Sequence, residues 1–117
     1  MDIRLKRQEN PPLSPPVFYI LLALADRERH GYAIMQEVER RTGGAVELGP
    51  GTLYRSLRQL LDRGLIVEVE ADPGASQPRR PYALTPEGRS KAGEEARRLQ
   101  SLVRWAEDAM VLEGGQP

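Results

Sequence analysis

Two short stretches of the sequence carry arginines with no acidic neighbour. In GPGTLYRSLRQLL the only charged residues are Arg55 and Arg58, and in PGASQPRRPYAL they are Arg79 and Arg80. A guanidinium group is planar, always charged and rich in N–H donors, so it pairs with phosphate oxygens and with the major-groove edge of guanine. The four arginines therefore indicate two local basic surfaces suited to contact with nucleic acid.

Composition argues against most catalytic and metal-binding chemistry. The 117 residues carry 17 basic and 17 acidic side chains, so binding of nucleic acid depends on local arginines and not on net charge. There is no cysteine and one histidine, His30, which leaves no thiolate site, histidine cluster or Cys–His pair. The G-x-x-x-x-G-K-S/T motif of a phosphate-binding loop is also absent. We predict a protein that is not an enzyme, with no catalytic residues, no metal site and no cofactor.

The first arginine pair lies on a predicted helix with clear ends. Gly49-Pro50 supplies a start with proline in the first turn, and Gly64 stands where a left-handed residue ends a helix. Leucines at positions 53, 57, 60 and 61 have the spacing of a buried face. The two arginines and Tyr54 lie off this stripe, so they are predicted to point outward.

Two further helices are predicted before this one. A polar, proline-rich arm over residues 1–14 is expected to be flexible, and Ser14 is a candidate N-cap. Apolar residues at positions 17, 20, 21 and 24 then have the spacing of a buried helical face. His30-Gly31 breaks this pattern, and a second helix is predicted at 32–41, where apolar residues recur in steps of three: Tyr32, Met35 and Val38.

The second arginine pair lies in a predicted β-hairpin. LIVEVEAD, residues 65–72, alternates apolar and acidic side chains, as a half-buried strand does. DPGASQPRR has the composition of a turn, and PYALT is the returning strand. Because Pro81 has no N–H to donate, it fits only an edge or the first position of that strand.

A long helix is predicted after the hairpin. Thr85 as N-cap and Pro86 in the first turn start it, and it runs to about Leu112, a length of about 40 Å. Its apolar residues form two stripes, one with heptad spacing, and a single chain would leave one stripe exposed. We predict a homodimer interface formed by Ala96, Leu99, Leu102, Val103, Trp105, Ala106 and Met110. The alternative is one wide core face on a bent helix.

The order of these elements predicts a mainly α (α+β) fold, a winged helix-turn-helix domain with a two-stranded wing and a long C-terminal dimerisation helix. The expected organisation is a flexible arm at 1–14, a DNA-binding domain at 15–84, a dimerisation helix at 85–113 and a disordered tail at 114–117. In this architecture the third helix enters the major groove and the wing contacts the DNA backbone or minor groove. The predicted DNA-binding residues are Gly51, Thr52, Tyr54, Arg55, Arg58, Arg79 and Arg80.

Four segments of the sequence resemble the PadR-like family of transcriptional regulators. They are ILLAL at 20–24, HGYAIMQEV at 30–38, GTLYRSLRQLLDRGLI at 51–66 and RRPYALTPEGR at 79–89. The resemblance implies a homodimeric repressor that leaves its operator on a small-molecule effector or a stress signal. The expected partner is double-stranded DNA, a pseudo-palindromic operator. Separately, the lack of cysteine and of an apolar run of about 18 residues predicts a cytoplasmic protein with no membrane partner.

The sequence departs from the family in places that bear on function. Family wings commonly carry a basic residue where this chain has Pro81, which changes the expected wing contact. Some small members stack flat aromatic drugs between tryptophans at the dimer centre. Here the only tryptophan, Trp105, comes late in the last helix and the central Leu99 is aliphatic, so such a site is not predicted.

Plainer interpretations of these residues stay open. Tyr54 either contacts a phosphate or caps the junction between the helix and the wing, and Trp105 packs in an interface or forms a ligand platform. Arg55 and Arg58 are DNA contacts or ordinary solvated charges, and His30 is a helix-start residue or a pH sensor. The alternative function is a homodimeric protein-interaction module without DNA binding.

Overall fold

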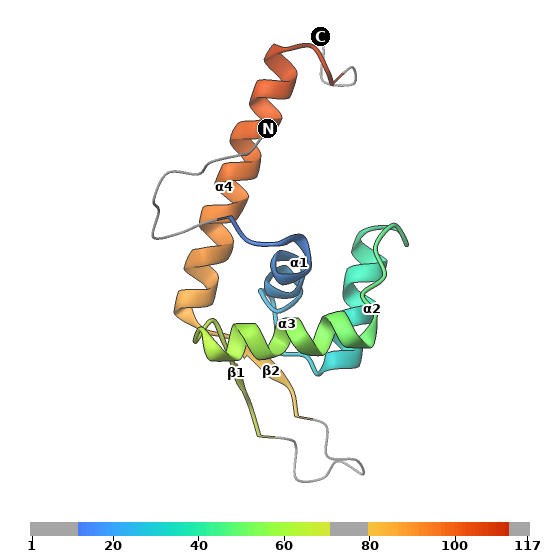
Figure 1. Cartoon of the computed structure of the whole chain (residues 1–117), viewed down its shortest axis with the longest axis vertical. Helices are drawn as coiled ribbons and strands as arrows, with labels where there is room; N and C mark the ends of the chain where they lie inside the picture. The colour runs from blue at the N-terminus through green and yellow to red at the C-terminus, as the bar shows by residue number, and fades with distance from the viewer. Residues whose placement is uncertain (1–11, 71–79, 113–117) are drawn as a thin grey trace.

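The computed structural model describes residues 12–70 and 80–112. Within them the chain forms α1 (Pro15–Ala23), α2 (Gly31–Arg41), α3 (Pro50–Asp62), β1 (Ile66–Glu68), β2 (Tyr82–Leu84) and α4 (Pro86–Asp108). α1 lies between α4 and α2, α3 crosses beneath it, and the two strands extend below α3 (Figure 1). This arrangement confirms the predicted α+β winged helix-turn-helix fold with a long C-terminal helix. The predicted arm up to residue 11, the turn of the hairpin at 71–79 and the tail from residue 113 lie outside the described residues.

The ends of the helices follow local signals in the sequence. α1 starts after Ser14 with two prolines in its first turn, and α2 starts at Gly31, one residue earlier than expected. His30 is its N-cap, since the His30 Nδ1 accepts a hydrogen bond from the Ala33 N–H at 3.3 Å. α3 starts at Pro50 and ends where Gly64 adopts a φ of 73°, which lets the next N–H return to the Leu60 carbonyl at 3.0 Å. The helix-start role of His30 is therefore confirmed.

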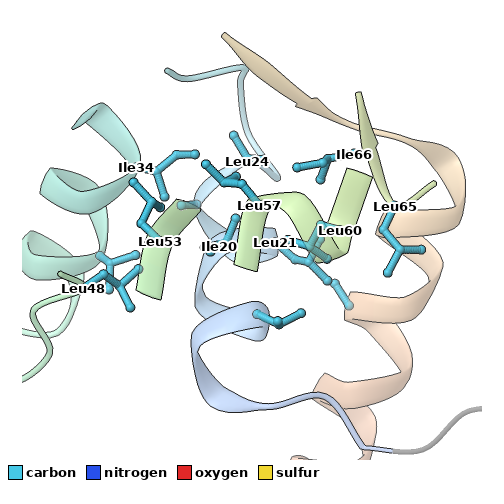
Figure 2. Close-up of a cluster of buried hydrophobic side chains, with 14 of the residues drawn as sticks. Ile20, Leu21, Leu24, Ile34, Leu48, Leu53, Leu57, Leu60, Leu65 and Ile66 are labelled. Atoms are coloured by element: carbon cyan, nitrogen blue, oxygen red, sulfur yellow. The ribbon is translucent and has the colours of Figure 1, made fainter. Parts of the chain in front are cut away.

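The core lies where α1, α2 and α3 meet the base of the hairpin (Figure 2). The predicted face of α1 at positions 17, 20, 21 and 24 is buried, and so are three of the four leucines of α3, with Leu61 partly buried beside them. The buried face of α2 is Gly31, Ile34 and Val38. The predicted three-residue steps found Val38, and Met35 is partly buried against the core, but Tyr32 is exposed and Ile34 was missed. A helix turns 100° per residue, so the i, i+4 pair of Ile34 and Val38 stays on one face while steps of three drift away from it.

The hairpin is short and antiparallel. Ile66 pairs with Leu84, Val67 with Ala83 and Glu68 with Tyr82. β1 is shorter than the predicted strand at 65–72, although the Val69 N–H still donates to the Pro81 carbonyl at 2.8 Å. Pro81 precedes β2, so it stands where a missing N–H does no harm.

α4 begins as predicted and ends earlier. Thr85 is its N-cap, accepting a hydrogen bond from the Gly88 N–H at 3.0 Å, and Pro86 is in its first turn. The helix stops at Asp108 and not near Leu112, because Met110 adopts a left-handed φ of 62° and the Val111 N–H returns to the Ala106 carbonyl at 2.9 Å. The helical spacing that put Met110 in the predicted interface therefore does not extend to it.

Candidate nucleic-acid interface

The outer face of α3 is basic and exposed. Arg55 and Arg58 are both exposed, on the side of the helix opposite the buried leucines. Among the described residues no carboxylate lies within 4.0 Å of either guanidinium. The two arginines thus keep their full charge and their donors for an external partner.

The N-terminal end of α3 adds polar backbone groups to the same surface. Gly49 is the N-cap and has no side chain to accept from the first N–H groups of the helix, and Gly51 is exposed while Thr52 is half-buried. A helix N-terminus carries partial positive charge, so it favours a nearby phosphate. The absence of an acidic residue in the first turn leaves that charge uncompensated.

Tyr54 lies over the junction between α2, α3 and the wing. A methyl group built on Gly31 would come within 2.9 Å of the Tyr54 hydroxyl and 3.3 Å of its ring, so the tyrosine rests on the first turn of α2. Burial, followed by the charges of Glu68 and Tyr54, raises the pKa of the Tyr82 hydroxyl, which indicates that the two tyrosines are neighbours. Tyr54 itself is 54% exposed, so the junction contact leaves its outer edge open to a partner.

The wing contributes one described arginine. Arg80 is exposed and its Nη1 lies 3.6 Å from the Glu68 carboxylate across the hairpin, a surface pair that water screens strongly. Arg79 lies outside the described residues. Figure 1 shows the strands extending beyond α3, so the wing and α3 face the same end of the molecule.

The residues of the predicted dimer interface are largely uncovered in the single chain. Only the first half of α4 packs on the body, with Gly88, Ala92 and Glu95 buried. Beyond it, Leu99 and Ala106 are half-buried, and the others are exposed: Ala96, Leu102, Val103, Trp105 and Met110. The alternative of one wide core face within the chain is therefore wrong. Trp105 is 69% exposed.

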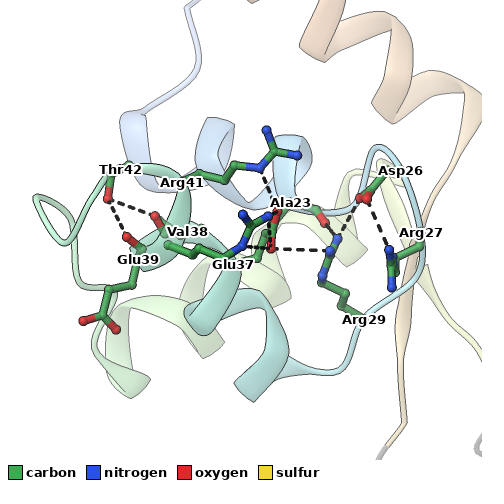
Figure 3. A network of polar contacts seen from close by, with 10 residues as sticks. Ala23, Asp26, Arg27, Arg29, Glu37, Val38, Glu39, Arg41 and Thr42 are labelled. Carbon is green, nitrogen blue, oxygen red and sulfur yellow. Dashed lines mark hydrogen bonds and ion pairs between the residues drawn. The ribbon is translucent and has the colours of Figure 1, made fainter.

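Sequence patterns did not reveal a network of charges between α1 and α2. Arg29 contacts Asp26 and Glu37, and Glu37 also accepts from Arg40 and Arg41 (Figure 3). The spacing of Glu37, Arg40 and Arg41 by three and four residues is a helical signal that could have found part of it. The contact between Arg29 and Glu37 joins the loop after α1 to α2, so it depends on tertiary structure and has no such signal.

Within residues 12–70 and 80–112, no group of three or more His, Cys, Asp or Glu side chains is arranged to hold a metal ion. None of the described helices is both long and apolar enough to cross a membrane.

Comparison with known proteins identifies the family. The model of the transcriptional regulator PadR-like family matches residues 20–94. The chain belongs to this family. PadR-like proteins are transcriptional regulators and not enzymes, which confirms the prediction from composition.

Two relatives illustrate how far the similarity extends. The transcriptional regulator Rv3488 of Mycobacterium tuberculosis (strain ATCC 25618 / H37Rv) is 38% identical over 86 residues, which are 74% of this chain and 77% of that protein. An uncharacterized 37.1 kDa protein in transposon TN4556 of Streptomyces fradiae is 40% identical over 83 residues. These are 71% of this chain but only 22% of that protein, so the PadR-like chain spans about a fifth of its length.

Solved structures share the PadR-like fold. A PadR family transcription regulator from Clostridium difficile R20291 has a TM-score of 0.72 at 22% identity, covering 83% of this chain and 99% of that one. Bacillus subtilis PadR in complex with operator DNA has a TM-score of 0.63 at 24% identity, covering 72% of this chain and 47% of that one. At these identities the likeness concerns the fold, and it agrees with the winged helix described above.

Proposed function

We propose that this PadR-like regulator binds double-stranded DNA sequence-specifically by placing α3 in the major groove and the wing against the backbone. The observation that carries the proposal is the exposed, acid-free outer face of α3, with Arg55 and Arg58 on it, on the same end of the molecule as the wing. The N-terminus of α3 with Gly51 and Thr52, the edge of Tyr54 and the wing arginines Arg79 and Arg80 complete the surface. The operator complex of the B. subtilis protein supports this docking by analogy of fold.

The regulator acts as a homodimer in this proposal. The outer half of α4 exposes Leu102, Val103 and Trp105, and apolar side chains grouped on one helix are expected to pack against another chain. A second copy offers the same stripe, so a two-fold axis lets the two helices cover each other. Two recognition helices then address half-sites of a pseudo-palindrome about one helical turn, or a multiple of it, apart.

The regulatory part of the proposal is repression that a small molecule or a stress signal relieves. A repressor blocks transcription by occupying its operator, and a DNA-binding regulator of this kind works in the cytoplasm.

An open hollow of about 480 Å³ between α1 and α2, bordered by Tyr19, Leu22, Val38 and Arg41, is large enough for a small ligand. Leu22→Arg would place a longer, charged side chain at the edge of this hollow, so it should weaken release by an apolar ligand that binds there while leaving DNA affinity unchanged.

The first test is DNA binding by the purified protein. Affinity for the duplex upstream of its own gene should exceed affinity for a scrambled duplex, and it should fall by about 0.9 log units per log unit of salt for each phosphate neutralised. A protein-interaction module would bind a protein partner through apolar surfaces with little dependence on salt. Equal, salt-insensitive binding to both duplexes, or none, would reject DNA recognition by this surface.

A further inference from the structure

Arg29 joins the wing to the helices through its backbone. Its N–H donates to the Tyr82 carbonyl at 3.1 Å, and its carbonyl accepts from the Tyr82 N–H at 2.8 Å. Residue 29 therefore forms an antiparallel bridge on the outer side of β2. Because Tyr82 also pairs with Glu68 of β1, this one bridge fixes the position of both strands.

The side chain of Arg29 holds the same segment to two helices. Its Nη1 donates to the Ala23 carbonyl at the end of α1 and to the Asp26 carboxylate at 2.7 Å. Its Nη2 lies 3.5 Å from a carboxylate oxygen of Glu37 on α2 (Figure 3). The side chain is only 11% exposed, as is that of Glu37. Breaking a largely buried ion pair leaves an uncompensated charge, so this segment resists displacement.

The partner of Arg29 is itself held firmly. Glu37 accepts from the Arg41 Nε at 2.9 Å and from the Arg40 Nη2 at 2.9 Å. These two hydrogen bonds lower the pKa of the Glu37 carboxyl, so it remains an anion at neutral pH. Arg29 thus ties the wing to a charge cluster anchored on α2.

The bridge lies between the two surfaces that are proposed to touch DNA. Arg80 is two residues before Tyr82 on the wing, and Gly31, two residues after Arg29, packs against Tyr54 of α3. A shift of the bridge would move the wing relative to α3. The distance between the two surfaces must match the distance between the groove and the adjacent backbone for both to bind at once.

We propose that Arg29 is a positioning residue for DNA binding, which sets the orientation of the wing relative to α3 without touching DNA itself. This inference rests on the proposed function for its consequence on DNA, but the clamp exists in the free protein. The two can therefore be tested separately.

The first measurement concerns the free protein. Arg29→Met keeps the unbranched stem of the side chain and removes the guanidinium group with its charge, and Arg29→Lys keeps the charge but loses the planar guanidinium. In both variants, the rate of deuterium exchange at the Tyr82 amide should rise about tenfold relative to the rate at the Leu57 amide of the core. A factor of about ten corresponds to the coupling energy that is typical of residues in one network. A purely structural loss would accelerate both amides alike. Arg27→Met is the control, because it removes an exposed charge whose one ion pair among the described residues is with Asp26.

The second measurement is a double-mutant cycle on operator DNA. Arg29→Met should weaken binding by about tenfold in the wild-type background and by clearly less in the Arg80→Ala background, because that variant has already lost the proposed contact between Arg80 and DNA. In the Arg58→Ala background the two losses should multiply, since α3 is a separate contact.

The outcomes separate the clamp from the proposed function. If folded Arg29→Lys shows unchanged exchange at Tyr82 and unchanged DNA affinity, the positioning role is wrong. If the losses with Arg80→Ala multiply instead of overlapping, Arg29 does not act through the wing. If the wild-type protein binds no DNA, the proposed function is wrong and the role in DNA binding is overturned with it, while faster exchange at Tyr82 would still support the clamp.

Discussion

At the scale of single residues, the described arginines fall into two groups. Those of the first group lie within 4.0 Å of a carboxylate and contribute to the fold or to surface pairs: Arg27, Arg29, Arg40, Arg41, Arg80 and Arg98. Those of the second group have no such partner in the described part of the chain: Arg55, Arg58, Arg63, Arg89, Arg97 and Arg104. Within the second group, Arg55 and Arg58 also lie on the outer face of the proposed recognition helix, where an uncompensated guanidinium can reach phosphates and base edges. These two are therefore proposed to contact DNA.

Arg55→Ala should therefore lower affinity for the specific operator by about 1–3 kcal/mol, because a bidentate contact to a base edge is lost. Arg80→Ala should weaken specific and scrambled duplexes alike, since a phosphate contact carries no sequence information. Titration of fluorescent duplexes at fixed salt measures both.

Arg104→Ala is the matched control, because it removes an exposed arginine from the outer half of α4. Its affinity for both duplexes should stay close to that of the wild type. Should Arg55→Ala and Arg80→Ala also behave like this control, the assignment of the DNA-binding surface would be wrong.

A buried glutamate predicts how stability depends on pH. Glu95 on α4 is 5% exposed, and its carboxylate accepts from the Arg98 Nε at 3.1 Å and from the Leu13 N–H at 3.3 Å. The hydrogen bond from Arg98, aided by that from Leu13 and opposed by burial, lowers the pKa of Glu95 below its ordinary value of 4.5. The charged form is thus favoured in the folded state, so its contribution is present above pH 4.5 and is lost as the pH falls through the lowered pKa.

Glu95→Gln should accordingly reduce the free energy of unfolding at neutral pH by about 1–2 kcal/mol, through the loss of charged hydrogen bonds. The difference from the wild type should shrink in acid, where the wild-type carboxyl is protonated. Urea denaturation at several pH values measures this. Glu94→Gln, next to it on the same helix but more exposed, should show neither effect, and a pH-independent difference for Glu95→Gln would contradict the role of its charge.

At the scale of elements, the sequence predicted best where a local signal fixes the backbone. Pro50 and Gly64 delimit α3, and Thr85 with Pro86 starts α4, because proline position, capping oxygens and left-handed glycines act within one helical turn. The outward direction of Arg55 and Arg58 followed from the leucine stripe in the same way. These features needed no knowledge of the rest of the chain.

What the sequence did not predict depends on residues distant along the chain or on weak local preferences. The bridge between Arg29 and Tyr82 joins segments 53 residues apart, so no periodicity reports it. α4 ends at a left-handed Met110, where no glycine marks the stop, and β1 is short although the alternation continues beyond it. The Tyr54 contact with Gly31 also required the packing of α2 against α3.

Among the described glycines, Gly88 packs most closely against its neighbours, and it lies where α4 joins the body of the molecule. A methyl group on Gly88 would lie 2.0 Å from the Leu65 carbonyl oxygen, and the Thr85 hydroxyl donates to the Gly64 carbonyl at 2.8 Å. α4 is therefore joined to the end of α3 and the start of the wing with no space between them. Gly88→Ala should destabilise the protein by about 1–3 kcal/mol, because the backbone has to separate to admit one carbon.

Gly93→Ala in the same helix is the matched control. A methyl group there would meet only the Arg97 guanidinium, 3.4 Å away at the end of a flexible side chain. It should stabilise the protein by about 0.5–1 kcal/mol, the usual gain of alanine over glycine in a helix. Thermal denaturation of both variants tests the junction, and equal effects would show that α4 does not pack there as described.

At the scale of the whole molecule, the two ends of the long axis carry different surfaces. α3 and the wing form the polar end, and the outer half of α4 extends from the body at the other (Figure 1). Since α4 is rigidly joined to α3 at Gly88, the angle at which two copies of α4 pack would set the distance between the two recognition helices. In the proposed dimer, the packing angle of the two α4 helices therefore determines the spacing of the half-sites.

Val103→Glu should convert the proposed dimer to a monomer, because it buries a carboxylate in the apolar stripe of each partner. Sedimentation velocity across a range of protein concentrations measures the change. Arg104→Glu makes a larger change of charge about 100° around the helix from Val103, off the predicted apolar stripe, and should leave the dimer intact. A Val103→Glu protein that sediments like the wild type would locate the interface elsewhere.

The same variant tests whether the dimer is the DNA-binding unit. Each subunit neutralises its own set of phosphates, so the monomer should show about half the wild-type slope of log affinity against log salt, at about 0.9 per phosphate. Its preference for a single half-site should persist, since α3 is unchanged in each subunit. A monomer with the full slope would mean that one α3 and one wing make all the contacts, and two-fold recognition of an operator would then be excluded.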